Sequence, residues 1–229
     1  ILVGQLRPTT YWERKVMTRV EKLIDKVRHE LSDLDKSRWS DVGLLGILTD
    51  AQEDIVYKTN CFHKTINILT SVDKNTYVLP EDVRLLKSIA FNNSSLSLVT
   101  TRWIESFNKD WKTAKGNPSY AIYDNIDRGA IKITPIPTEP EEIAITYLAN
   151  PVPVLSLTDD LTIDLSYDLG LFYYIVARAL SRDFDAQDVN VGSRYMLLYN
   201  KEIKRFLAES SKSFLATSRP FICPYQGFV

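Results

Sequence analysis

The chain of 229 residues has a net charge of −1, with 45% hydrophobic and 25% charged residues. This is the composition of an ordinary globular protein, long enough for one large domain or two small ones. The near-neutral balance excludes an overall field that would attract nucleic acid or anionic lipid. Cys61 and Cys223 are too few for a disulfide framework, so we expect reduced thiols. No apolar run is long enough to cross a membrane, and we expect no membrane partner.

Residues 1–10 begin with three apolar residues and form a short arm without periodicity. From about Tyr11 to Leu34 the apolar residues recur every three or four positions, which predicts a long amphipathic helix. Interleaved acidic and basic residues on its other faces are typical of a solvated surface. The alternative is a nucleic-acid-binding or processing module that uses the basic residues of this helix. These residues are Arg14, Lys15, Arg19, Lys22 and Lys26.

A second helix is predicted from Ser40, a favourable N-cap residue, to about Lys58. Between about residues 60 and 165 the apolar period changes to two, which predicts strands. Short links between them favour mostly antiparallel pairing. The segment 100–115 is ambiguous, with one helical turn near Trp103. The predicted strands lie at residues 64–68, 77–79, 85–91, 96–98, 120–123, 130–134 and 143–148.

The segment from Tyr167 to Asp183 is apolar on nearly all sides, which predicts a helix buried in the core of a soluble protein. A last helix is predicted from Val189 or Val191 to Ser210. Packing in a core is also the favoured interpretation of several aromatic residues, over stacking on nucleic acid bases. These are Trp103, Trp111, Tyr173 and Tyr174.

The fold class is therefore predicted to be α+β, a helical bundle formed by the N- and C-terminal helices with an inserted antiparallel β-rich domain. The bundle comprises residues 11–59 and 166–211, and the inserted domain comprises residues 60–165. Extended arms are predicted at both ends, at residues 1–10 and 212–229.

Residues suited to catalysis, cofactor binding or metal binding do not form a recognisable motif. His29 and His63 have no Cys, Glu or His nearby at metal-ligand spacing. Asp183, Asp185 and Asp188 alternate as calcium ligands do, but the glycine and the late glutamate of a calcium loop are missing. Helix capping is the favoured role of this acidic cluster. We expect no catalytic residues, no cofactor and no metal site.

The C-terminal residues are rich in large apolar side chains, broken by two prolines and a glycine, and cannot form an amphipathic helix. Exposed to water, such a segment would associate with other apolar surfaces. Either it packs back on its own domain, or it lies on a neighbouring chain as an assembly arm. The suspected assembly interface comprises Phe214, Phe221, Ile222, Tyr225 and Phe228.

A series of stretches occurs in order over about residues 38–188. It includes Arg38-Trp39-Ser40-Asp41, Tyr77-Val78-Leu79-Pro80-Glu81-Asp82, Ile133-Thr134-Pro135-Ile136-Pro137 and Ala177-Arg178-Ala179-Leu180. Together these stretches resemble the head-to-tail adaptor proteins of tailed bacteriophages, most closely those of short-tailed phages. A connector of a long-tailed phage is a structural alternative with different partners.

The resemblance implies a structural virion protein, not an enzyme. Such adaptors form ring homo-oligomers of about twelve copies under the portal protein and connect it to the tail nozzle protein. Genomic DNA passes through the lumen without sequence-specific contact. The implied location is the head–tail junction of the virion, assembled in the bacterial host cytoplasm.

Overall fold

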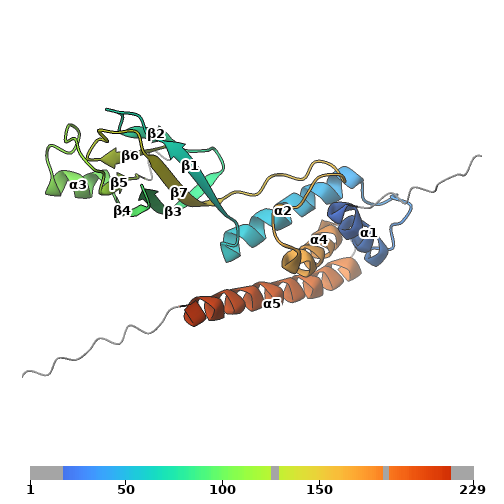
Figure 1. Cartoon of the computed structure of the whole chain (residues 1–229). Coiled ribbons are helices and arrows are strands. Elements are labelled where there is room, and N and C mark those ends of the chain that lie inside the picture. Colours follow the sequence, from blue (N-terminus) through green and yellow to red (C-terminus); the bar gives the residue numbers. More distant parts are fainter. Residues whose placement is uncertain (1–17, 125–128, 183–185, 218–229) are drawn as a thin grey trace, which may run out of the picture.

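The computed structural model describes residues 18–124, 129–182 and 186–217 of the chain. The fold is α+β, as predicted. Figure 1 shows a group of helices beside a curled sheet that follows the C-terminal end of α2. The helices are α1 (Arg19–Glu30), α2 (Asp41–Thr59), α3 (Thr101–Phe107), α4 (Asp168–Arg182) and α5 (Ala186–Thr217), with a short 3-10 helix, η1, at Leu165–Tyr167.

Helix α1 begins after Thr18, which forms a capping box with Glu21: each side chain accepts the other residue's backbone N–H at 3.1 Å. The start predicted at Tyr11 lies outside the described residues. The end predicted at Leu34 is wrong, because the helix stops one turn earlier and Leu34 is exposed. The reason is the left-handed backbone of Ser32, with φ of 52°, which redirects the chain toward α2.

Helix α2 has the predicted N-cap, since the Ser40 hydroxyl accepts the Gly43 N–H at 3.1 Å. It ends at Asn60, whose backbone is left-handed. The apolar side of α2 joins those of α1, α4 and α5 in one core. Its fully buried members include Val20, Leu44, Leu48, Ile55, Leu171, Ile175 and Tyr199.

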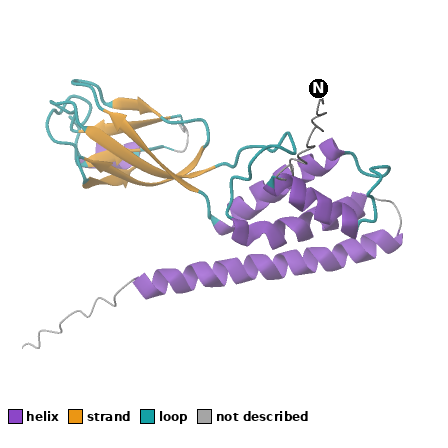
Figure 2. Cartoon of the chain, turned by 45° about the vertical axis from the view of Figure 1, so that its right-hand side comes forward, coloured by secondary structure: helices purple, strands orange, loops and turns teal. Residues whose placement is uncertain are grey.

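Helix α4 lies in this core as predicted, but one side of it is open. Leu169 is 44% exposed, and Phe172 and Tyr173 are half-buried. Helix α5 is longer than predicted at both ends, so residues 212–217 of the predicted arm continue the helix backbone. Figure 2 shows α5 running along the other helices and extending past them.

The sheet has seven strands in the order β1-β7-β3-β4-β5-β6-β2. All pairs are antiparallel as predicted except β4 and β5, which are parallel. The predicted antiparallel domain is therefore a mixed one, because the segment with α3 forms a crossover long enough to return the chain to the end of the sheet where β4 begins, so that β5 runs parallel to β4. The strands are β1 (His63–Leu69), β2 (Thr76–Val78), β3 (Val83–Phe91), β4 (Ser94–Val99), β5 (Tyr120–Ile122), β6 (Ala130–Thr134) and β7 (Glu142–Ala149).

The sheet encloses a hydrophobic core of its own, built from alternate residues of its strands. The chain leaves the helices and returns to them at adjacent points, since the Ala149 N–H donates to the Phe62 carbonyl oxygen at 3.1 Å. Phe62 packs against both cores. Arg84 on β3 donates to the Asn60 side chain at 2.6 Å and to the Val56 carbonyl at 3.3 Å. These contacts form the joint between helices and sheet.

Candidate assembly surfaces

The polar residues considered for catalysis or metal binding are separate in the structure. His29 and His63 are exposed at distant points, and no group of three or more metal-ligand side chains forms within the described ranges. Of the acidic cluster, Asp188 forms an ion pair with Arg38 at 2.5 Å, whereas Asp183 lies outside the described residues, as does Asp185. No described helix is long and apolar enough to cross a membrane.

The suspected assembly interface lies almost entirely beyond the part of the chain that the structure describes. The backbone of Phe214 belongs to α5, and Phe221, Ile222, Tyr225 and Phe228 follow the last described residue. The prediction that these side chains form an interface therefore stays a prediction. Helix α5 does expose apolar residues along its described length, among them Leu197 and Leu198.

The aromatic residues predicted to be core residues divide into two groups. Trp111 and Tyr174 are buried as predicted. Trp103 is 44% exposed and stacks on Phe107, which is 69% exposed, with ring centroids 5.5 Å apart. The core prediction for Trp103 is wrong because the residue that the short helix α3 buries is Ile104. The two rings form an exposed aromatic pair.

A groove of about 720 Å³ lies between α1 and the segment from η1 to α4. Lys22 and Lys26 line it from α1, whereas Leu165 and Leu169 line it from the other side. Arg19 is held within it by Asp168, whose carboxylate accepts from the guanidinium at 2.5 Å. We call this cavity the basic groove, because Lys22 and Lys26 form no ion pair with any described residue.

A second cavity of about 510 Å³ lies between α2, β3, α4 and residues 150–151. Its lining includes the carboxylates of Asp50, Glu53 and Asp54, so we call it the acidic pocket. Asp54 accepts a hydrogen bond from the buried Tyr199 hydroxyl and one from Lys58 at 2.6 Å. Burial, and then the hydrogen bond to Asp54, raise the pKa of Tyr199, which therefore remains a hydrogen-bond donor.

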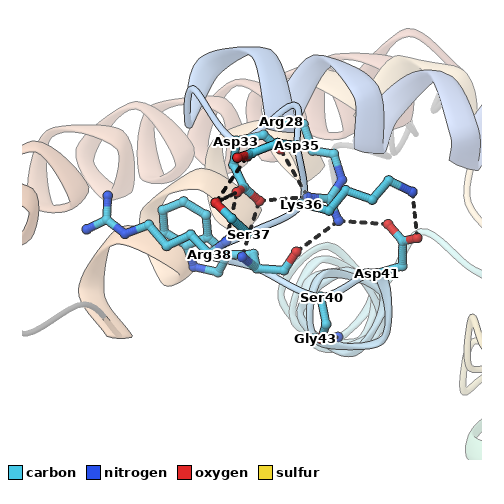
Figure 3. A network of polar contacts seen from close by, with 10 residues as sticks. Arg28, Asp33, Asp35, Lys36, Ser37, Arg38, Ser40, Asp41 and Gly43 are labelled. Carbon is cyan, nitrogen blue, oxygen red and sulfur yellow. Dashed lines mark hydrogen bonds and ion pairs between the residues drawn. The ribbon is translucent and has the colours of Figure 1, made fainter.

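An ionic network around the buried pair Arg28 and Asp33 fixes the turn between α1 and α2 (Figure 3). Arg28, which is 3% exposed, donates to Asp33 and to Asp41, at 2.7 Å each. Lys36 donates to the other oxygen of Asp41 at 2.8 Å. Hydrogen bonds from Lys36, and then from Arg28, lower the pKa of Asp41. The network pins the start of α2 to the end of α1.

The pKa of Asp33 is lowered although its carboxylate is almost fully buried. Burial alone would raise this pKa, but the backbone N–H groups of Arg38 and Trp39 and the charge of Arg28 outweigh it. The two N–H groups lie 2.9 and 3.2 Å from the Asp33 oxygens. Asp33 therefore remains ionised and organises the loop around itself.

The surface of the described residues thus carries two cavities that combine charged and apolar side chains, and an exposed aromatic pair. Residues 18–220 match the family described as SU10 adaptor protein. The chain therefore belongs to this adaptor family, and the resemblance to phage head-to-tail adaptors is confirmed. No curated protein matches the chain.

Proposed function

We propose that the protein forms a ring of about twelve copies beneath the portal protein of a bacteriophage. In this proposal the ring connects the portal to the tail nozzle protein, and genomic DNA passes through its lumen. DNA is contacted through phosphates at most and is not read by sequence. The protein is assembled in the host cytoplasm and resides at the head–tail junction of the virion.

The extent of the family match is the observation that carries this proposal. The match at residues 18–220 covers every described helix and strand, in the helical part and in the sheet part alike. The similarity therefore extends over all the described elements and is not limited to one shared motif. The two separate hydrophobic cores also support it, because a subunit with complete cores remains folded before it joins a ring.

In our proposal the C-terminal segment docks the subunit to its neighbours. Helix α5 carries the chain past the other helices (Figure 2), and large apolar residues follow it. Obligate interfaces bury roughly 2,000 Å² or more, which an extended segment supplies without enlarging the folded subunit. Ordering such a segment costs conformational entropy, so docking requires a preformed surface. That surface is the portal ring or an adjacent copy.

Electron microscopy of the protein alone, and mixed with the portal protein of the same phage, tests the proposal. We expect rings seated on the portal. Deleting residues 218–229, which keeps α5 intact, should abolish portal binding. Replacing Val78 and Leu155 with serine removes exposed apolar side chains elsewhere and should leave binding unchanged. Normal portal binding by the truncated chain would show that the C-terminal segment is not the docking segment. The absence of rings in every sample would contradict the adaptor function.

A nucleic-acid-binding module is the alternative function, and the structure gives it less support. Arg19 lies in the middle of the predicted basic row. Its guanidinium donates hydrogen bonds to the Asp168 carboxylate and to the carbonyl oxygens of Ile163 and Asp164. Lys22 and Lys26 line the basic groove together with the apolar side chains of Leu165 and Leu169. DNA binding by the isolated chain that weakens steeply with salt would favour this alternative. Weak binding by the monomer, independent of sequence, is what the adaptor proposal expects.

A further inference from the structure

The basic groove and the acidic pocket have complementary chemistry. Each combines an exposed apolar surface with two exposed residues of like charge that form no ion pair among the described residues, although Glu30 also lines the groove and Arg84 the pocket. In the groove these are Lys22 and Lys26, beside Leu165, which is 66% exposed. In the pocket they are Asp50 and Glu53, beside Tyr57, which is 72% exposed.

The spacing of the two charged rows also corresponds. Lys22 and Lys26 are one helical turn apart on α1, a separation of about 6 Å along the axis. Asp50 and Glu53 are nearly one turn apart on α2, about 4.5 Å along the axis. Tyr57 is one further turn along the same side of α2, as positions four residues apart are. The two acidic side chains therefore have a spacing close to that of the two lysines.

The two cavities lie on different sides of one subunit, so a subunit cannot close them on each other. Helix α4 contributes Leu169 to the groove and Tyr174 to the pocket. These residues are separated by about 140° around the helix, at about 100° per residue. An interface built from two different faces repeats head to tail, and it generates a ring when the rotation closes.

We propose that the basic groove of one copy receives the acidic pocket edge of a second copy, and that this contact is the subunit interface of the ring. In it, Asp50 and Glu53 meet Lys22 and Lys26 of the adjacent copy, and Tyr57 packs on Leu165 and Leu169. This inference rests on the proposed ring function, and it specifies which faces meet.

Charge reversal tests the interface directly. One variant carries Lys22→Glu and Lys26→Glu, so that its groove and pocket are both acidic. The other carries Asp50→Lys and Glu53→Lys, so that both are basic. In each variant alone, the proposed interface would join like charges. We therefore expect its self-association to be at least about 100-fold weaker than that of the unaltered protein. Sedimentation velocity and electron microscopy, with and without portal protein, measure the assembly.

Mixing the two variants distinguishes loss of the interface from loss of the fold. Every contact between unlike variants again joins opposite charges, so the mixture should form rings although neither variant does alone. A control variant with Lys87→Glu and Lys109→Glu has the same change in net charge as the groove variant, at exposed positions of the sheet part. It should assemble normally.

The outcomes separate this inference from the proposed function. Rings formed by the unaltered protein and by each reversed variant alone would overturn the interface and leave the adaptor function standing. Failure of the mixture to assemble, with both variants folded by circular dichroism, would also overturn it. Ring formation by the groove variant after deletion of residues 1–17 would indicate that the chain's own N-terminal segment, and not a second copy, occupies the groove, and would likewise overturn the interface. If the unaltered protein forms no ring with or without portal, both proposals fail.

Discussion

Arg28 and Asp33 form an ion pair that is almost completely buried, with exposed fractions of 3% and 2%. Removing one partner of such a pair leaves a buried charge without compensation. The Asp33→Asn variant should therefore lose about 3–5 kcal/mol of unfolding free energy in chemical denaturation. Asp25→Asn, an exposed change on α1, should stay within about 0.5 kcal/mol of the parent. Equal stabilities of the two variants would contradict a central role for the pair.

The same carboxylate predicts the acid sensitivity of the fold. Because the pKa of Asp33 is lower in the folded protein, its contribution is fully present above the ordinary aspartate pKa of about 3.9. The contribution is lost as the pH falls from that value through the lowered one. The difference in unfolding free energy between the parent and Asp33→Asn should be constant near neutral pH and shrink in this acidic range.

At the scale of elements, glycines in two helices have opposite roles. A Cβ at Gly192 on α5 would lie 3.0 Å from the Ala177 carbonyl oxygen and 3.3 Å from the Leu180 Cβ on α4. Gly192 thus permits close packing of α5 on α4. A Cβ at Gly46 on α2 would have no neighbour within 4 Å.

Alanine substitution should therefore have opposite effects at the two positions. Gly46→Ala should stabilise the protein by about 1 kcal/mol, the gain in helix propensity. Gly192→Ala should destabilise it despite the same gain, because the backbone oxygen at 3.0 Å can yield only by separating the helices. Thermal unfolding of the monomer measures both. A stabilised Gly192→Ala would show that α4 and α5 separate at little cost.

The helix and strand boundaries show which elements can be predicted from local sequence patterns. The capping chemistry of Ser40 and the alternation in β1 and β7 are local signals, and they predict α2 and these strands well. The end of α1 was missed because Leu34 continues the apolar spacing while Ser32 adopts a left-handed backbone. The parallel pairing of β4 and β5 depends on where the crossover places the chain, which periodicity does not report.

The two complementary cavities were also missed, for a physical reason. Lys22 and Leu165 are far apart in sequence, and only packing of α1 on α4 brings them to one groove. Trp103 was misassigned because a seven-residue helix has too few turns to show which side is buried. The overall class was accessible, since the ordered motifs over residues 38–188 do not depend on such distant contacts.

At the scale of the whole molecule, Arg84 links the sheet to the end of α2. Arg84→Met keeps the aliphatic part of the side chain and removes both hydrogen bonds. We expect a broader distribution of distances between spin labels placed at Asn93 on the sheet and Arg178 on α4. The measurement requires serine at Cys61 and Cys223, so that only the labelled positions react.

Lys87→Met, an exposed change on the same strand, is the matched control and should leave the distribution narrow. Unfolding free energy should change little in either variant, because neither hydrophobic core contains the guanidinium. An equally narrow distribution in Arg84→Met would mean that Phe62 and the paired strands β1 and β7 fix the joint without it.

The adjacency of Phe62 and Ala149 has an evolutionary consequence. A segment whose two ends meet can be lengthened, trimmed or exchanged in a genome without disturbing the host fold around it. Changes in the length of the sheet part should therefore disturb the fold less than changes in α1, α2, α4 and α5, whose apolar sides share one core.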